Sequence, residues 1–94
     1  MMTGTIEIIF HATFREITKK RKIIHKISED CTFGIILTEL VKKYGNDFKN
    51  IIDPQTDKIS NDILVMLNGK VIREIEEKIK DKDVLTFTLP VGGG

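Results

Sequence analysis

Apolar and polar side chains alternate over residues 5–11, the first patterned segment of the chain. Ile6, Ile8 and Phe10 share one face of this segment, and most residues of the other face are polar. A period of two predicts a strand with one buried face. Residues 23–27 form a second, weaker strand candidate, and we expect the charged segment between the two strands to form their connection.

The clearest helical pattern begins directly after Thr32. Thr32 suits the N-cap position, and Gly45-Asn46 supplies a C-terminal stop. Six apolar residues recur between these limits at helical spacing and form one stripe. They are Phe33, Ile36, Leu37, Leu40, Val41 and Tyr44.

Turn residues divide the second half of the chain into short segments. Residues 46–62 are polar and interrupted by a proline, so we expect a long connection with a short turn around residues 48–52. Residues 63–67 are continuously apolar, which is typical of a buried strand. Asn68-Gly69 follows directly and predicts a hairpin turn into a short return strand, because both residues tolerate a positive φ.

The last third of the chain ends in a strongly patterned strand. Isoleucines spaced by three and four residues over 72–79 first favour a short helical turn. Alternation then predicts a strand over residues 84–89 with its threonines outward, and Pro90 ends it because proline has no N–H for the sheet. The expected inward positions of this strand are Leu85, Phe87 and Leu89.

The order of these elements indicates an α+β fold. One main helix packs on one face of a mixed sheet of four or five strands. The first and last strands should lie side by side at the centre of that sheet. We expect a single domain over residues 1–90 and a flexible tail over residues 91–94.

Charge and composition narrow the classes of partner. The formal net charge is +1, so no basic field draws the domain to nucleic acid or to an acidic membrane. We interpret the basic run Lys19-Lys20-Arg21-Lys22 as a solvated loop or hairpin tip. A single cysteine fits a reducing compartment, and the chain lacks a signal-peptide pattern and a transmembrane stretch. We therefore expect a cytoplasmic protein.

Side chains suited to catalysis or soft-metal binding are few. His11, His25 and Cys31 are the only histidines and cysteine, and their spacing matches no metal-binding or Cys–His motif. We expect no metal site, no tightly bound cofactor and no independent enzymatic activity.

The remaining candidate is the tail Pro90-Val91-Gly92-Gly93-Gly94. Glycine has no Cβ, so such a tail can enter a narrow cleft and bring its carboxylate against a nucleotide or an attacking sulfur. Four residues from Val91 extend at most about 13 Å, enough to reach into a partner's active site. A frayed, uninformative end is the alternative, and spacing alone leaves both interpretations open.

Five segments in this order carry a resemblance to a known family. They are residues 10–16, the helix from Thr32, Leu67-Asn68-Gly69, Lys80-Asp81-Lys82-Asp83 and Pro90-Val91-Gly92-Gly93-Gly94. Together they are similar to the small, sulfur-carrying subunit of molybdopterin synthase, within the ubiquitin-like β-grasp group.

The resemblance implies a carrier whose working group is the carboxylate of Gly94. An E1-like adenylyltransferase would adenylate this carboxylate with ATP, and a persulfide sulfur donor protein would convert it to a thiocarboxylate. The sulfur would pass to a pyranopterin precursor in the large subunit of molybdopterin synthase, for molybdenum or tungsten cofactor biosynthesis. Gly92 and Gly93 would thread the partner's cleft, and the catalytic side chains would belong to the partners.

The family's partner-contact positions correspond by motif to His11, Val71 and Thr88, with Pro90 and Val91 of the tail beside them. Two of the first three are polar here, whereas partner patches usually have an apolar centre.

Related families leave a second function open. The chain also resembles archaeal small modifier proteins and eukaryotic ubiquitin-related modifiers, which are joined through a terminal glycine to lysines of target proteins. A thiamine-pathway sulfur carrier is less expected, because that family usually lacks an insertion like residues 46–62. Lys82 stands where many members of the carrier family have glycine, and a positive φ there would cost lysine about 1 kcal/mol.

Overall fold

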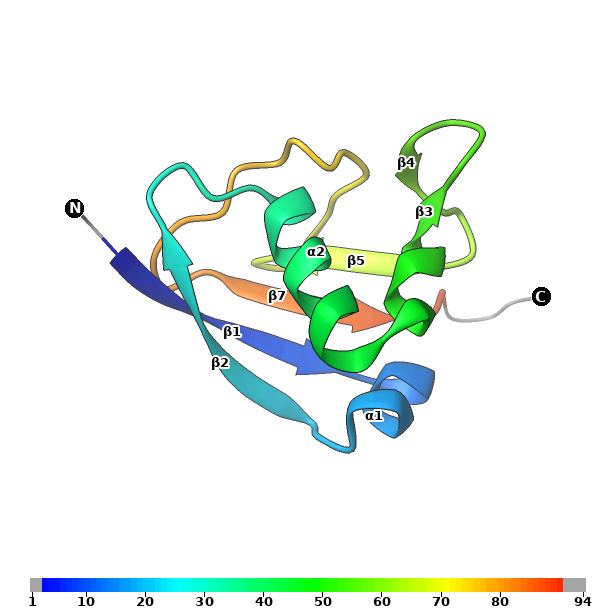
Figure 1. Cartoon of the computed structure of the whole chain (residues 1–94), viewed down its shortest axis with the longest axis horizontal. Helices are drawn as coiled ribbons and strands as arrows, with labels where there is room; N and C mark the ends of the chain where they lie inside the picture. The colour runs from blue at the N-terminus through cyan, green and yellow to red at the C-terminus, as the bar shows by residue number, and fades with distance from the viewer. Residues whose placement is uncertain (1–2, 91–94) are drawn as a thin grey trace.

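The computed structural model describes residues 3–90, which alternate strands with short helical segments (Figure 1). The elements are β1 (Thr3–Phe10), α1 (Ala12–Thr18), β2 (Lys22–Ser28), α2 (Phe33–Tyr44), the 3₁₀ helix η1 (Asn46–Ile51), β3 (Ile52–Asp53), β4 (Lys58–Ile59), β5 (Leu64–Leu67), β6 (Lys70–Val71) and β7 (Val84–Thr88).

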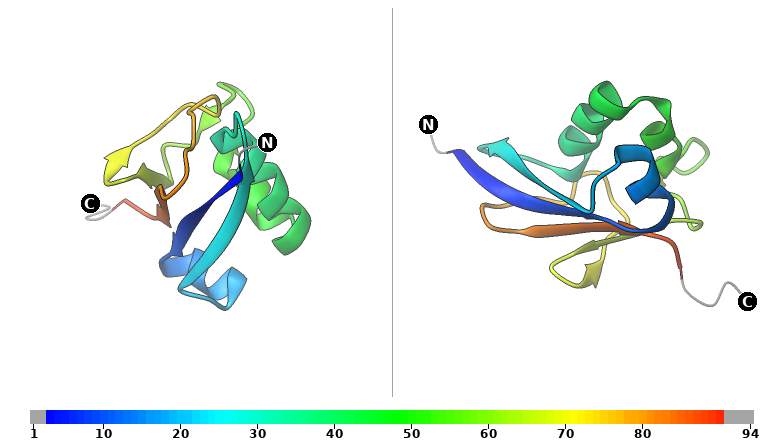
Figure 2. Two further views of the ribbon diagram at one scale, coloured as in Figure 1. Left: turned by 90° about the vertical axis from the view of Figure 1, so that its left-hand side faces the viewer. Right: turned by 90° about the horizontal axis from the view of Figure 1, so that it is seen from below.

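Five of these strands form one mixed sheet in the order β2-β1-β7-β5-β6. β1 and β7 are parallel, and the other neighbouring pairs are antiparallel. α2 lies across one face of this sheet, as the views in Figures 1 and 2 agree. The predicted α+β fold is confirmed, and so is the central position of the first and last strands.

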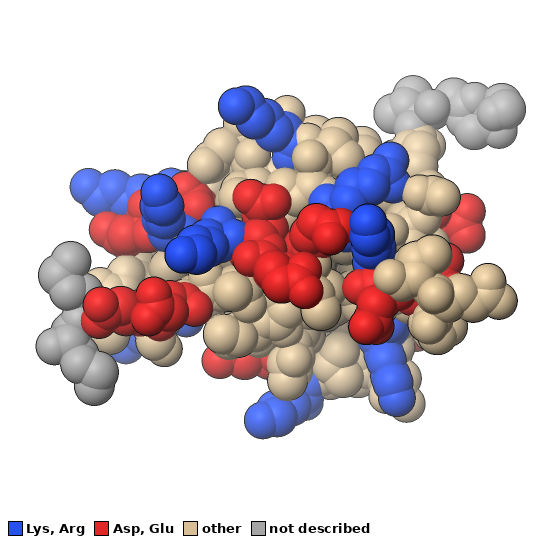
Figure 3. Space-filling view, turned by 90° about the horizontal axis from the view of Figure 1, so that it is seen from above, with Lys and Arg blue, Asp and Glu red and all other residues tan. Residues whose placement is uncertain are grey.

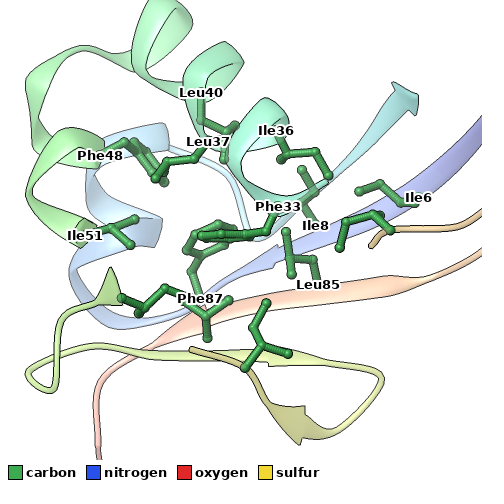
Figure 4. Packing of buried hydrophobic residues seen from close by; sticks show 14 of the residues in the cluster. Ile6, Ile8, Phe33, Ile36, Leu37, Leu40, Phe48, Ile51, Leu85 and Phe87 are labelled. Atoms are coloured by element: carbon green, nitrogen blue, oxygen red, sulfur yellow. The ribbon is translucent and has the colours of Figure 1, made fainter. Parts of the chain in front are cut away.

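The core lies between the sheet and α2. Ile8 is opposite Leu85 and Phe10 is opposite Phe87 in the β1–β7 register, so these side chains share the covered face. Figure 4 shows Phe87 pointing from β7 toward the side chains of α2 and η1. The Phe87 ring centroid lies 5.7–5.9 Å from four other phenylalanine rings, an ordinary separation for packed aromatic side chains. They are Phe10, Phe14, Phe33 and Phe48.

The predicted ends of α2 are confirmed. The Thr32 hydroxyl oxygen accepts a hydrogen bond from the Ile35 N–H at 3.4 Å, as an N-cap does. Gly45 follows the helix with a φ of 94°, and its N–H donates to the Val41 carbonyl at 2.8 Å. Glycine suits this position because a side chain there would be strained.

Two connections contain regular structure that the sequence patterns did not predict. Residues 12–18, expected to be part of a connection, form α1, whose buried side chains are Phe14 and Thr18. Two buried positions are too few for a periodic pattern. Within 46–62, η1 overlaps the expected short turn, but the β3–β4 hairpin was missed because strands of two residues show no alternation.

The expected helical turn over residues 72–79 is wrong. This segment contains a turn and one isolated bridge, and two of its carbonyl groups accept hydrogen bonds from N–H groups at the start of α2. The Phe33 N–H donates to the Glu77 carbonyl at 2.9 Å. The Gly34 N–H donates to the Ile75 carbonyl at 2.8 Å. The first N–H groups of a helix have no partner within the helix. The segment stays non-helical because its carbonyl groups accept hydrogen bonds from these N–H groups of α2.

Both special turns of the second half are present. Asn68 and Gly69 have φ values of 53° and 86° and join β5 to β6, which confirms the predicted hairpin. Lys82 has a φ of 72°, so it adopts the positive φ that was expected to cost lysine about 1 kcal/mol if it occurred there. Leu89 was expected inward but lies beyond the end of β7 and is 38% exposed, because the sheet no longer holds the chain there.

Candidate functional site

The end of β7 is the support from which the candidate tail departs. Val91, Gly92, Gly93 and Gly94 lie outside the described residues, so the structure defines the site up to Pro90. β7 is held on both sides, by β1 in parallel and by β5 in antiparallel pairing. A strand paired on both edges is a rigid support, and its last residue is two positions before Pro90.

Backbone hydrogen bonds extend this support beyond the sheet. The His11 N–H donates to the Phe87 carbonyl at 3.0 Å, directly after the end of β1. The Phe10 N–H donates to the Arg21 carbonyl at 2.8 Å. The chain therefore joins the end of β7, the turn into α1 and the start of β2 at one end of the sheet. His11 is exposed at this junction.

The face of the sheet opposite α2 carries two of the expected partner-contact residues. Val71 pairs with Met66, and Thr88 pairs with Leu64, so all four side chains share this open face. Val71 is 51% exposed, while the other three are half-buried. Leu64 and Met66 were missed as candidates. Their alternation with the buried Val65 was the available signal, and it was hidden because all three are apolar.

The open face continues over β1 and β2. Ile9 pairs with Thr86 of β7, and Ile24 pairs with Glu7. Ile24 is 63% exposed, more than any other large apolar side chain among the described residues. The face is thus more apolar than the expected contact positions suggested, with isoleucine, leucine, methionine and valine interleaved with threonines.

Two of the segments behind the family resemblance meet at the opposite end of β7. Asn68 Nδ2 donates to Asp83 Oδ1 at 2.9 Å, and the Val84 N–H donates to Asn68 Oδ1 at 2.8 Å. The Lys80 N–H donates to Asp83 Oδ2 at 2.8 Å. These residues therefore anchor the β5–β6 hairpin to the first residue of β7, which is a structural role and not a catalytic one.

A surface hollow beside this hydrogen-bond network is lined by both acidic and basic side chains. Figure 3, seen from above, shows Asp and Glu side chains gathered near the middle of that view with Lys and Arg around them. The residues lining the hollow are Leu67, Asn68, Glu74, Glu76, Glu77, Lys78, Lys80 and Asp83.

The cysteine and the second histidine are engaged in local structure. Cys31 is 4% exposed, and its Sγ lies 3.6 Å from the Thr32 carbonyl. Burial, with a smaller contribution from the Glu39 carboxylate, raises the pKa of the Cys31 thiol. A buried thiol with a raised pKa is a poor nucleophile. His25 Nε2 instead lies 2.6 Å from Glu39 Oε1, linking β2 to α2.

Neither a clustered ligand set nor a membrane span is found in residues 3–90. Within that range no three His, Cys, Asp or Glu side chains are placed to hold a metal ion. No helix there is long and apolar enough to cross a membrane.

Comparison with known proteins decides the family. The model described as the ThiS family matches residues 8–94, which includes the whole segment from the end of β7 to Gly94. The chain belongs to the ThiS family. Its β-grasp fold and its similarity to a small archaeal modifier protein agree with the expected resemblance.

Relatives of this ThiS-family chain include proteins with different names. Small archaeal modifier protein 3 of Haloferax volcanii is 26% identical over 92 residues, covering 95% of this chain and 98% of the relative. The solution structure of the Haloferax volcanii HVO 2177 protein is also 26% identical and has a TM-score of 0.81, covering 98% and 88% of the two chains.

A third relative is known in a complex. The structure of subunits 1 and 2 of molybdopterin-converting factor from Helicobacter pylori contains a chain 21% identical to this one. Its TM-score is 0.61, and the match covers 96% of this chain and 99% of that one. This structural neighbour therefore shares the fold of the chain and is found in a complex with a second subunit.

Proposed function

We propose that this chain is a sulfur carrier activated at Gly94, which donates sulfur for molybdopterin cofactor biosynthesis. The observation that carries the proposal is the position of β7. This strand is paired on both sides and ends at Thr88, two residues before Pro90, so the glycine tail leaves from a fixed support. The family match through Gly94 supports the same assignment.

The chemistry takes place at the tail and uses groups of partner proteins. A carboxylate oxygen of Gly94 attacks the α-phosphorus of ATP in an E1-like adenylyltransferase, and pyrophosphate leaves. The terminal sulfur of a donor protein's persulfide attacks the acyl carbon, and AMP leaves. A second thiol then reduces the resulting acyl disulfide, which releases the thiocarboxylate and forms a disulfide. These steps need no cofactor bound by the chain itself, and because activation consumes ATP we place the chain in the cytoplasm.

Cysteine chemistry within the chain is not needed for this sequence of steps. Cys31 is buried and its thiol pKa is raised, so the sulfur that is transferred resides on the tail and not on this side chain. Gly92 and Gly93 allow the tail to pass through a narrow cleft because they carry no Cβ.

The open face of the sheet is the proposed contact with the large subunit of molybdopterin synthase. Val71 and Thr88 lie there with Leu64 and Met66 between them, which supplies an apolar centre. His11 would contribute at the rim, beyond the end of β1, and Pro90 and Val91 would contact the partner where the tail enters it. The molybdopterin-converting factor complex supports a two-subunit arrangement of this kind.

The second candidate function is protein modification. Similarity to small archaeal modifier protein 3 over 95% of this chain favours it. The same acyl adenylate would form at Gly94. A lysine ε-amine of a target protein would then displace AMP and form an isopeptide bond.

Intact-mass measurement of the protein from its native host tests the carrier proposal. Under ample sulfur supply, part of the population should show the mass increment of one oxygen replaced by sulfur, located on the peptide that contains Gly94. Deleting Gly94 should remove the increment and leave the unfolding curve unchanged, because the buried core lies within residues 6–87. Cys31→Ala is the matched control and should keep the increment.

Two results would count against the carrier. A wild-type protein without the increment, but with glycine remnants of this tail on lysines of other proteins, would favour the modifier. An increment of one added sulfur atom that persists after Gly94 is deleted and disappears in Cys31→Ala would place the sulfur on the thiol as a persulfide and overturn the proposed site.

A further inference from the structure

Five cationic side chains gather beside the end of α1. Arg15 lies on that helix, and the run that follows it contributes the others; we call these residues the basic loop. They are Arg15, Lys19, Lys20, Arg21 and Lys22, and all are exposed. Four of the five line a surface hollow together with Ala12 and Glu16.

The basic loop has a fixed conformation, unlike an ordinary solvated loop. Thr18 is 4% exposed, and its hydroxyl lies 2.9 Å from the Phe14 carbonyl and 3.1 Å from the Lys20 carbonyl. The same oxygen accepts from the Lys20 N–H at 3.2 Å. Lys19 adopts the left-handed conformation with a φ of 65°, and its N–H donates to the Arg15 carbonyl at 2.8 Å. The backbone that carries these cations is therefore fixed before any partner binds.

Most of these charges are available to a partner. Lys22 Nζ lies 3.7 Å from Glu7 Oε1, a long and exposed ion pair. Among residues 3–90, Arg15, Lys20 and Arg21 form no ion pair at all. Exposed cations without a carboxylate partner are free to interact with an external anion.

The basic loop lies at the end of the sheet from which the tail departs. Figures 1 and 2 place α1 at the end of the sheet where β1 and β7 finish. The hydrogen bonds from Phe10 to Arg21 and from His11 to Phe87 connect the start of β2 to the end of β7 across β1. Two strand spacings separate β2 from β7, or about 10 Å. Four extended residues span about 13 Å, comparable with this separation, so a protein that accepts the tail comes close enough to contact the basic loop.

We propose that the basic loop binds an acidic rim on the E1-like adenylating partner, next to the cleft that receives the tail. This inference rests on the proposed function and names the surface and the charge through which that partner recognises the chain. Charge complementarity of this kind orients an encounter and raises the rate of association. Glu16 and Glu7 lie among the cations, and the net charge of the chain is only +1. This mixture of charges favours a small acidic protein surface as the partner over RNA, because RNA-binding proteins usually present a broader basic face.

ATP–pyrophosphate exchange by the adenylating enzyme of the same host tests the inference, with this chain as the varied substrate. The test variant is Lys20→Glu/Arg21→Glu. It should raise KM for the chain about tenfold or more with little change in kcat, because each reversal replaces an attraction by a repulsion. Lys20→Gln/Arg21→Gln should give a smaller rise. The wild-type KM should increase with salt, and that dependence should weaken in both variants.

The matched control is Lys42→Glu/Lys49→Glu. Both lysines are exposed beside a different hollow, between α2 and η1, and this variant changes the net charge equally. It should leave KM near the wild-type value. Thermal unfolding of each variant confirms that the fold is retained.

The outcomes separate the two proposals. Failure of the wild-type chain to be activated at all would overturn the proposed function. Normal activation of wild type with an unchanged KM in Lys20→Glu/Arg21→Glu would overturn only the docking inference. Binding of bulk transfer RNA by wild type, lost in that variant while its KM is unchanged, would also overturn it and assign the loop to RNA.

Discussion

The hydroxyl of Thr18 should determine the conformation of the basic loop, and Thr18→Val tests this directly. Valine has nearly the shape of threonine but can neither donate nor accept a hydrogen bond. The wild-type hydroxyl accepts from the Lys20 N–H and has one proton to share between the carbonyls of Phe14 and Lys20. The substitution therefore removes one donated and one accepted bond at a buried position.

The expected loss can be worked from these contacts. Two hydrogen bonds at about 1 kcal/mol each amount to about 2 kcal/mol. The added apolar methyl group returns about 0.8 kcal/mol, which leaves a net loss of about 1–1.5 kcal/mol. For a domain of this size that loss corresponds to a fall of roughly 5–10 °C in Tm.

Two measurements together test the reasoning. Urea unfolding followed by circular dichroism gives the free energy of unfolding, and amide hydrogen exchange reports the Lys20 N–H itself. Exchange at Lys20 should accelerate in Thr18→Val and remain near the wild-type rate in Thr18→Ser, which keeps the hydroxyl. Unchanged exchange at Lys20 in Thr18→Val would refute the argument, whatever the change in overall stability.

Three further predictions concern the core, the turn before β7 and the cysteine. Phe87→Ala should lower the free energy of unfolding, measured in urea, by about 3–5 kcal/mol because Phe87 packs on four buried rings. Phe87→Leu should lower it clearly less, and equal losses in the two variants would contradict the ring packing. Lys82→Gly should raise the free energy of unfolding by about 1 kcal/mol because glycine adopts a φ of 72° without strain. A lower free energy of unfolding in urea for this variant would count against that backbone conformation. The raised pKa of the Cys31 thiol implies that its stabilising contribution is complete below the unfolded pKa of about 8.5 and lost as pH rises through the folded pKa. Wild-type stability in urea should therefore fall above about pH 8.5 more steeply than that of Cys31→Ala, and parallel pH profiles would show that folding does not raise the pKa of the thiol.

Local patterns in the sequence were sufficient to predict the helices and strands whose apolar residues recur with a single clear period. The stripe over residues 33–44 predicted α2 together with its N-cap Thr32, and alternation predicted β1 and β7. Turn chemistry at Asn68-Gly69 is equally local, because the backbone itself demands a positive φ there. In each case a few neighbouring residues contain the physical cause.

The candidate site was predictable only in part. The tail and its family were recognisable from short motifs, and the family match agrees with that recognition. The apolar character of the open face was not recognisable, because Leu64, Val65 and Met66 are all apolar and only the register with β7 separates the buried one from the other two. The basic run read as a plain solvated loop, since no pattern reveals that a buried hydroxyl fixes it.

What the sequence by itself determined is thus the strands of the five-stranded sheet, the main helix, the hairpin turn and the glycine tail. Only the tertiary structure decided that residues 72–79 stay non-helical, that the basic loop is held by Thr18, and that it lies at the end of the sheet from which the tail departs. The reason is physical. Periodicity shows which side chains of a single element are buried. The hydrogen-bond partners of a helix's first N–H groups, and the strands that end at the same edge of a sheet, depend on residues far apart in the chain.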